Sequence, residues 1–200
     1  MSKEDVMAWQ RAIGAAQDGD FGPDTLRRSL ALLPVLPAKT DLPWLTSIKS
    51  VFGLQEVRDK ARLQLWLRSD GKTLGDPTAL PWCGDAVETA IKTALPAEPF
   101  VGDLAINPYW ARNWITFGRA AKGYGSVGVF ERGTGGHVGF LVGEDSTAYH
   151  VLGGNQGDSV NVTRIEKGRL LAARWPLTWK NDPTPLPAKP ATIPLSVNEV

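Results

Sequence analysis

Cysteine and histidine are scarce in this chain, which has one Cys and two His in 200 residues. The single cysteine, Cys83, excludes an internal disulfide framework. With so few thiolate and imidazole ligands, we expect no structural zinc site. The net charge is +1, from 22 basic and 21 acidic residues, so no strong field favours nucleic acid. We therefore expect no cofactor and no nucleic-acid partner.

Long apolar runs are missing as well. No uninterrupted run approaches the roughly 20 residues that a membrane span needs. The first five residues, Met-Ser-Lys-Glu-Asp, lack the apolar core of a secretory signal. We therefore expect synthesis in the cytoplasm without a signal peptide, and no membrane insertion. A hydrophobic content of 42% in this length suits one full domain with a small appendage.

The stretch that carries most chemistry is Leu-Pro-Trp-Cys-Gly-Asp-Ala-Val, residues 80–87. Cys83 follows a turn-forming proline, and apolar residues recur after it at helical spacing through Ala94. This pattern predicts a helix with Cys83 in its first turn. Free backbone amides and the helix dipole favour a thiolate there, and the thiolate is the nucleophile. The plainer interpretation makes Cys83 a small buried hydrophobic residue.

A second informative stretch, Gly-Gly-His-Val-Gly-Phe-Leu-Val, spans residues 135–142. It predicts a glycine turn that leads into an apolar strand with His137 near its start. A lone Cys on a helix start and a His on a distant strand is an arrangement that cysteine hydrolases use. In that chemistry His137 pairs with the Cys83 thiolate and then protonates the leaving amine. The alternative is a buried His with ordinary hydrogen bonds.

These motifs resemble those of the papain-like cell-wall hydrolases of the CHAP and NlpC superfamily, most closely its phage-associated branch. The resemblance rests on PWCGDAV, GGHVGFLVGED and VLGGNQGDSVNV, and it covers roughly residues 41–175. It implies a papain-like α+β fold and an endolysin-type amidase or endopeptidase that acts on bacterial peptidoglycan. It also implies action at the cell wall or periplasm as a monomer, after holin-dependent release.

Two residues compete to orient His137. If residues 143–146 form a hairpin loop, Gly139 pairs with His150, which then shares a sheet face with His137. NlpC-type enzymes place a second His on this strand. CHAP enzymes instead carry an Asn just beyond it, which corresponds to Asn155, although Asn155 also suits a left-handed turn. A catalytic zinc held by His137, His150 and a carboxylate is a further alternative, without the His-Glu-x-x-His helix of common zinc hydrolases.

Four further residues are candidates for substrate binding. Trp82 precedes the nucleophile, and Asp85 follows it by two positions, although helix-dipole preference alone explains an Asp there. Tyr109 and Trp110 belong to an aromatic segment that lines one side of the cleft in the resembled family. That segment, Trp110 to Ala121, has helical spacing, and its aromatic stripe is typical of a core.

The chain divides into three parts in this interpretation. Residues 1–36 resemble one repeat of a peptidoglycan-binding helical module, with two helices around Asp-Gly-Asp-Phe-Gly-Pro-Asp-Thr; a hairpin that packs on the next domain is the alternative. Residues 37–177 form the hydrolase domain. Residues 178–200 form a Pro-rich tail, either an extended strap or a disordered end.

The hydrolase domain is predicted to be α+β, with helices first and an antiparallel sheet afterwards. Asp41 is the expected N-cap of its first helix, which ends near Gly53, and a second helix is expected over residues 57–68. Five strands are expected, over residues 127–130, 138–142, 147–152, 159–165 and 170–175.

Two other functions fit the same sequence. A wall-binding, virion-associated or secretion-associated structural module would keep the fold without the reaction. An antibacterial toxin would use the same chemistry on a rival's cell wall. The presence of both Cys83 and His137 favours a catalytic protein.

Overall fold

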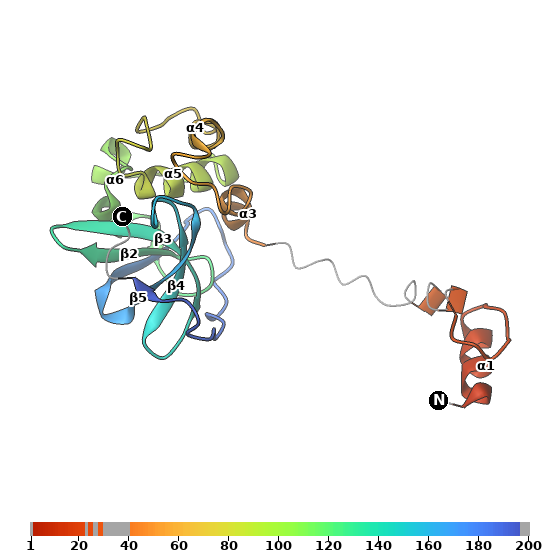
Figure 1. The fold of residues 1–200 in the computed structure, drawn as a ribbon. Helices are drawn as coiled ribbons and strands as arrows, with labels where there is room; N and C mark the ends of the chain where they lie inside the picture. The colour runs from red at the N-terminus through yellow and green to blue at the C-terminus, as the bar shows by residue number, and fades with distance from the viewer. Residues whose placement is uncertain (1, 23, 26–27, 30–40, 197–200) are drawn as a thin grey trace. The chain divides into compact units, whose positions relative to one another are not determined.

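The computed structural model describes residues 2–22, 24–25, 28–29 and 41–196. The chain forms two compact units, Met1–Thr40 and Asp41–Val200, and each is described by itself (Figure 1).

The first unit begins with helix α1, Lys3–Ala12. Ser2 and Asp5 form a capping box, in which the Asp5 amide donates to the Ser2 hydroxyl at 3.1 Å and the Ser2 amide donates to the Asp5 carboxylate at 2.8 Å. Such a pair satisfies two amides that a helix start leaves without partners. Residues 24–25 and 28–29 are helical again, and the rest of the predicted second helix lies outside the described residues.

The second unit contains a seven-stranded sheet in the order β1-β6-β2-β3-β4-β5-β7. Its strands are β1 Arg119–Ala120, β2 Val127–Arg132, β3 Gly135–Glu144, β4 Ala148–Gly153, β5 Asn161–Glu166, β6 Leu170–Trp175 and β7 Leu195–Ser196. Strands β2 to β6 occupy the five predicted positions. The sheet is mixed rather than purely antiparallel, because β7 pairs with β5 in parallel. Both additional strands, β1 and β7, are two-residue edge strands, too short to leave a period-2 signal.

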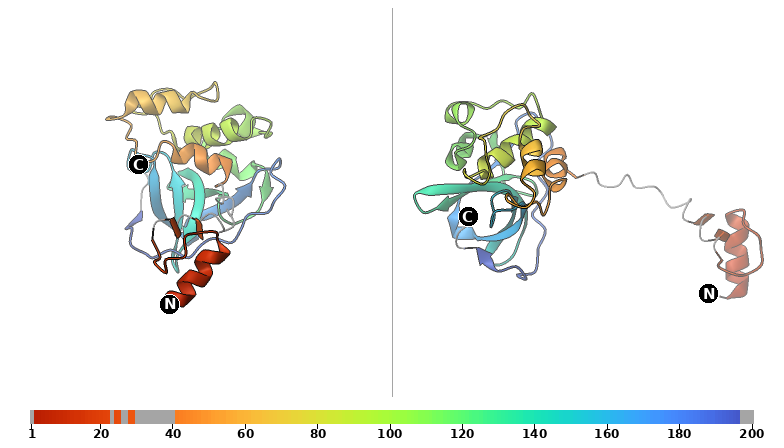
Figure 2. Two further views of the ribbon diagram at one scale, coloured as in Figure 1. Left: turned by 90° about the vertical axis from the view of Figure 1, so that its right-hand side faces the viewer. Right: turned by 45° about the horizontal axis from the view of Figure 1, so that its top comes forward.

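Helices cover one face of this sheet, as both views in Figure 2 show. They are α3 Pro43–Lys49, α4 Lys60–Leu67, α5 Cys83–Ala94 and α6 Asp103–Ile106, with short 3-10 helices η1 Ala111–Thr116 and η2 Lys167–Arg169. The main core lies between helices and sheet, where Ile48 and Ala86 share one buried cluster with Val138. A smaller cluster around Phe130 and Leu141 lies on the other face. The alternation of strand side chains accounts for the two clusters.

Two helix predictions need correction. Leu42, not Asp41, caps α3, and Asp41 instead forms an ion pair with Lys49. The predicted helix over residues 110–121 is only the short helix η1. The Trp114 indole donates to the Pro108 carbonyl at 2.8 Å, and Gly118 adopts a φ of +50°, which turns the chain into β1. Helical spacing therefore marked Trp114 and Phe117 correctly as buried, but it was wrong for Trp110 and for the backbone.

The Pro-rich tail runs extended along the second unit as far as β7. The Glu144 amide donates to the Pro187 carbonyl at 3.0 Å, and the Lys189 amide donates back to Glu144 at 2.8 Å. The Arg164 guanidinium also donates to the Ile193 carbonyl at 2.9 Å. The tail therefore follows the predicted strap through residue 196, and residues 197–200 lie outside the description.

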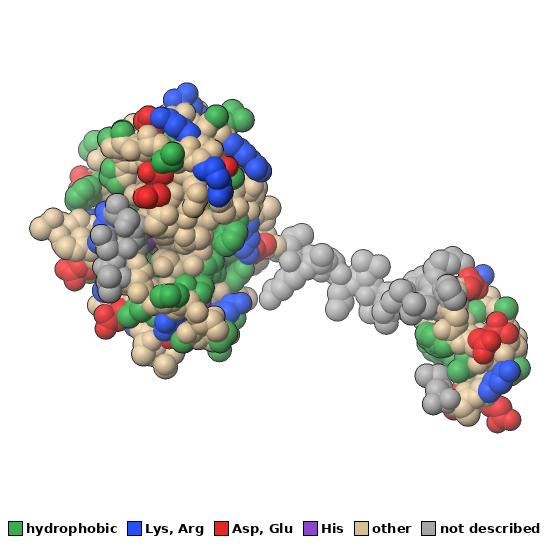
Figure 3. All heavy atoms as spheres, viewed as in Figure 1, with side chains coloured by type: hydrophobic (Ala, Val, Ile, Leu, Met, Phe, Trp, Pro, Cys, Tyr) green, Lys and Arg blue, Asp and Glu red, His purple; other side chains and the backbone are tan. Residues whose placement is uncertain are grey.

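The described surface carries both signs of charge. In Figure 3, Lys and Arg side chains alternate with Asp and Glu over the face in view. None of the described helices is long and apolar enough to cross a membrane.

Candidate functional site

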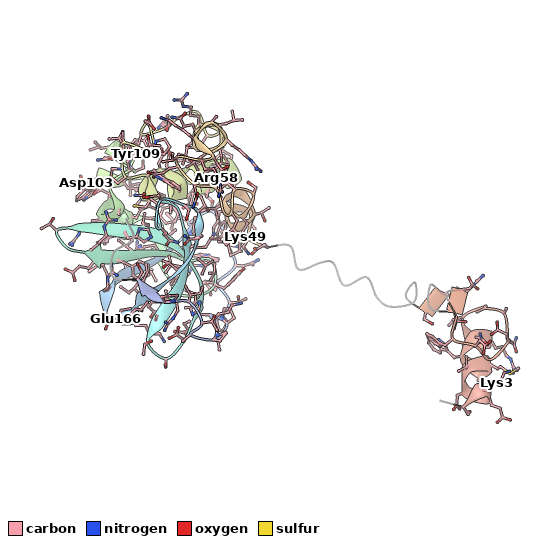
Figure 4. The ribbon with its side chains drawn as sticks, viewed as in Figure 1. Lys3, Lys49, Arg58, Asp103, Tyr109 and Glu166 are labelled. Atoms are coloured by element: carbon pink, nitrogen blue, oxygen red, sulfur yellow. The ribbon has the colours of Figure 1, made fainter. Side chains whose placement is uncertain are left out.

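Cys83 begins helix α5, and it is buried. The residue before it, Trp82, is buried and donates its indole N–H to Glu56 at 2.8 Å. The residue after it, Gly84, packs so closely on the Tyr109 carbonyl that a Cβ there would lie 2.3 Å from the oxygen. These neighbours fix the first turn of α5. In Figure 4, Tyr109 lies on the helical side of the sheet, opposite Glu166.

Three backbone amides influence the pKa of the Cys83 thiol. They belong to Val138, Gly84 and Cys83 itself, and each favours the thiolate, as does the positive charge of Arg132. Burial acts in the opposite direction and is the larger effect, so the pKa of the Cys83 thiol lies above its ordinary value. The sequence predicted a stabilised thiolate at the helix start. In the structure, the effect of burial on this pKa outweighs the groups that favour the ionised form.

His137 lies on β3 opposite Phe130 of β2, and it is fully buried. Its Nε2 is 2.9 Å from Oε1 of Gln156. The Gln156 amide nitrogen donates to the carbonyls of Val151 and Asn161, at 3.2 and 2.8 Å, which fixes the orientation of the amide. Because a carboxamide oxygen only accepts hydrogen bonds, His137 Nε2 carries a proton in this pair.

The Cys83 sulfur and the His137 ring lie on opposite sides of β3, near the start of the strand. The Val138 amide that favours the thiolate belongs to the residue directly after His137. Side chains alternate along a strand, so Val138 joins the helix-side core with Cys83 while His137 leaves the strand on the other side. There the imidazole lies beside Gly153, whose ideal Cβ position is 3.5 Å from Nε2 and 2.9 Å from the Gln156 oxygen. Glycine at position 153 leaves room for the His137–Gln156 pair.

His150 does not join His137, and the predicted pairing of Gly139 with His150 is wrong. His150 pairs with Gly143, and the register shifts between Leu141 and Gly143. In the turn between these strands, the Asp145 carboxylate accepts from the Thr147 amide at 2.9 Å.

His150 belongs to a different network. Its Nε2 lies 3.0 Å from the Asp145 carboxylate, which also accepts from Arg164 Nε at 2.8 Å. Hydrogen bonds from Arg164 and from the Thr147 amide hold the pKa of Asp145 well below its usual range, against the effect of burial. The ring also lines a cavity of about 470 Å³ between the end of α3 and residues 189–193 of the tail.

Asn155 occupies the predicted turn, and its role as the group that orients His137 stays a prediction. It has a φ of +55°, a left-handed conformation that Asn tolerates better than most residues, and it is buried. Gln156, the next residue, reaches the imidazole. The sequence marked the turn that reaches His137, but it missed Gln156, which carries the same carboxamide group as Asn155.

The substrate-binding candidates lie in different surroundings. Asp85 is buried, and its carboxylate accepts from the Thr73 hydroxyl and the Leu74 amide, both at 3.0 Å. Burial raises the pKa of Asp85 to about 6. Burial, and then the hydrogen-bonded Asp70 carboxyl, raise the pKa of Glu88 to about 8. These carboxyls anchor the loop after α4 on helix α5.

Trp82 has 1% of its surface exposed, whereas Trp110 has 49%. Tyr109 is partly buried, and burial, followed by the nearby carboxyls, raises its pKa to about 12. Of the four candidates, Trp110 therefore offers the largest surface to a ligand, and the role of all four in substrate binding stays a prediction.

Among the described residues, no group of three or more His, Cys, Asp or Glu side chains is arranged to hold a metal ion. Comparison of the chain with family models, curated proteins and solved structures found no match. The chemistry of the site therefore has to be inferred from Cys83, His137 and Gln156 themselves.

Proposed function

We propose that the chain is a cysteine hydrolase of bacterial peptidoglycan, an endolysin-type amidase or endopeptidase that cleaves an amide of the stem peptide. One observation carries the proposal: Val138, the residue that follows His137, packs in the same buried cluster as Cys83, and His137 itself hydrogen-bonds to Gln156. A nucleophile, a base and a group that orients the base are the parts that acyl transfer requires.

Each residue has a defined role in this reaction. In this reaction a water molecule relays the thiol proton around the start of β3 to His137 as the Cys83 sulfur forms a bond to the substrate carbonyl carbon. The amides around the sulfur lie where they stabilise negative charge on the carbonyl oxygen. His137 then returns the proton to the leaving amine as the C–N bond breaks, and water hydrolyses the thioester. Gln156 keeps Nε2 protonated and the ring in one orientation.

The raised pKa of Cys83 decides when the ion pair forms. Because burial keeps the thiol protonated in the free protein, proton transfer to His137 accompanies substrate binding. In this proposal the resting site is neutral, and its amides act on charge that develops only during the reaction.

A second candidate function has a specific observation in its favour. Cys83 has only 4% of its surface exposed, which a structural cysteine in a wall-binding or virion-associated module would also show. A wall-degrading toxin would share the chemistry of the first proposal and differ in the cell that it attacks. The N-terminal unit, through its resemblance to peptidoglycan-binding repeats, fits either role as a wall tether.

The proposal is tested on purified peptidoglycan by turbidity and mass spectrometry, with wild type, Cys83→Ser and His137→Ala, each with and without a chelator. We expect new amine termini from wild type alone, unaffected by the chelator, and fragment masses that identify the bond. Full activity of Cys83→Ser would contradict the assignment of the nucleophile. Binding without release of fragments, across several wall types, would favour the binding module.

A further inference from the structure

Arg132, the last residue of β2, has an unusual environment for an arginine. Its Nη1 is buried and has no hydrogen-bond partner among the described residues. A guanidinium stays charged at all physiological pH values, so an unpaired buried N–H costs free energy that the fold does not recover internally. The neighbouring Arg112 differs, because its Nε donates to the Gly135 carbonyl at 2.6 Å and its Nη2 lies 3.9 Å from Glu131.

The strand register places Arg132 beside the catalytic pair. Phe130 pairs directly with His137, and Arg132 pairs with Gly135. Since side chains alternate, Arg132 and His137 share one face of the β2–β3 hairpin as diagonal neighbours, within reach of a long side chain. The positive charge of Arg132 also favours the thiolate of Cys83. Arg132 is thus a cation near both reacting groups, and its Nη1 donor has no acceptor among the described residues.

We propose that Arg132 binds a carboxylate of the substrate next to the bond that is cleaved. A guanidinium presents paired N–H groups that match a carboxylate, and such charge-assisted pairs are among the stronger hydrogen bonds in proteins. A carboxylate here would supply the acceptor that Nη1 lacks. The inference rests on the proposed hydrolase and narrows its substrates to acyl groups with a free carboxylate beside the scissile amide. Substrates in which that carboxylate is amidated are poor substrates.

The single cysteine allows a test that needs no turnover. Iodoacetate and iodoacetamide alkylate the same sulfur and differ only in a carboxylate against a carboxamide. We expect Arg132→Gln to lower the ratio of the iodoacetate rate to the iodoacetamide rate about tenfold. This change corresponds to the loss of one charge-assisted hydrogen bond. Arg68→Gln, an exposed arginine at the end of α4, removes the same net charge and leaves the ratio unchanged. An unchanged ratio in Arg132→Gln overturns the proposal.

A second measurement serves if the buried thiol excludes both reagents. Thermal unfolding of the full chain is followed with N-acetylglycine, which carries a carboxylate, and with N-acetylglycinamide, which does not. We expect N-acetylglycine to raise the unfolding midpoint of wild type and of Arg68→Gln but not of Arg132→Gln. Equal responses to the two compounds, or no response to either, overturn the proposal.

The unliganded variant separates a binding role from a structural one. An arginine that holds the fold together would lower the midpoint when replaced, whereas removal of an unpaired buried donor leaves the midpoint of Arg132→Gln equal to or above that of wild type. A clearly lower midpoint therefore counts against the inference.

Failure of the inference and failure of the proposed hydrolase have different signatures. If peptidoglycan is cleaved but the alkylation ratio and the midpoint shifts do not depend on Arg132, the hydrolase stands and the carboxylate site falls. If peptidoglycan is not cleaved but both readouts depend on Arg132, the carboxylate site stands beside a cysteine with another role.

Discussion

Each unit of the chain has a buried glutamine at its centre, and the two glutamines differ in what they join. In the N-terminal unit, Gln10 Nε2 donates to the Asp18 carboxylate, the Asp20 carbonyl and the Thr25 hydroxyl, at 2.7 to 2.9 Å, and its Oε1 accepts from the Gly19 amide at 2.9 Å. All of these partners lie within 15 residues of Gln10. The amide shapes one loop, and its hydrogen-bond partners among the described residues include no imidazole or thiol.

Gln156 satisfies its own turn in the same way, through the carbonyls of Val151 and Asn161. Its oxygen, however, reaches His137 on a strand 19 residues away. The difference comes from the sheet. Strands β3 and β4 bring the His137 imidazole, which is distant in sequence, to the turn. Gln156 then contacts this imidazole as well as the backbone of its own turn. The same side chain therefore joins only nearby residues in one unit and contacts an imidazole from a distant strand in the other.

The largest effect should come from removal of the second glutamine. Gln156→Ala leaves the His137 ring without its orienting partner, and we expect the rate on soluble peptidoglycan fragments to fall about 100-fold, within the range for loss of a positioned acid–base group. Because the role is positional, kcat should fall far more than KM rises. Release of new amine termini, measured by mass spectrometry, provides both constants.

Gln10→Ala is the matched control for that experiment. Soluble fragments remove any contribution of wall binding, so this variant should cleave them at the wild-type rate. Equal loss of activity in both variants would show that the two glutamines act through general stability, and the contrast between them would fail.

Two glycines test how tightly each glutamine loop is packed. A Cβ on Gly154 would lie 2.3 Å from a Trp82 ring carbon and 2.7 Å from Ala86 Cβ, whereas a Cβ on Gly22, in the Gln10 loop, meets nothing within 4 Å. We expect Gly154→Ala to lower the free energy of unfolding by about 1–3 kcal/mol, as overpacked cores do. Gly22→Ala should change it by less than about 0.5 kcal/mol.

Urea unfolding of the full chain, followed by circular dichroism, measures both glycine variants. Since Trp82 precedes Cys83, Gly154→Ala should also slow peptidoglycan cleavage. Wild-type stability of Gly154→Ala would mean that the turn moves freely beneath the start of α5, which contradicts the packing described above.

The contribution of buried carboxyls to stability should depend on pH, whereas that of the buried glutamine amides should not. Glu88 has a pKa of about 8 in the folded protein against an ordinary value of 4.5. Its folded pKa is raised, so its contribution to stability is complete below pH 4.5 and is lost as the pH rises toward 8. Glu88→Gln mimics the protonated form. Its unfolding midpoint should match wild type near pH 4 and exceed it by about 3 °C or more at pH 8.

Thermal unfolding at pH 4, 6 and 8 measures this difference, and the exposed Glu166→Gln serves as control. The control should differ from wild type equally at all three pH values. A pH-independent difference for Glu88→Gln as well would mean that Glu88 ionises normally in the folded protein.

The sequence predicted the layered α+β arrangement, five of the strands and the start of α5 because these depend on local periodicity. It failed where strand register and the contacts of a turn decide which residues meet. The register shift between Leu141 and Gly143 places His150 opposite Gly143, and Gln156, which no motif marked, contacts the His137 imidazole. Arg132 carried no signal at all, because its lack of a partner is visible only once its surroundings are known.

The smallest effect should come from an ion pair near the first glutamine. Arg28 and Asp24, one helical turn apart, lie 2.8 Å from each other with 41% and 50% of their side chains exposed. Exposed pairs of this kind contribute about 0.3–0.5 kcal/mol, so Arg28→Gln should barely change hydrogen exchange at the Gly19 amide, and added salt should not matter. Gln10→Ala, which removes the acceptor of that amide, should speed its exchange strongly. If the two variants speed exchange equally, the charged pair rather than the buried amide holds the loop.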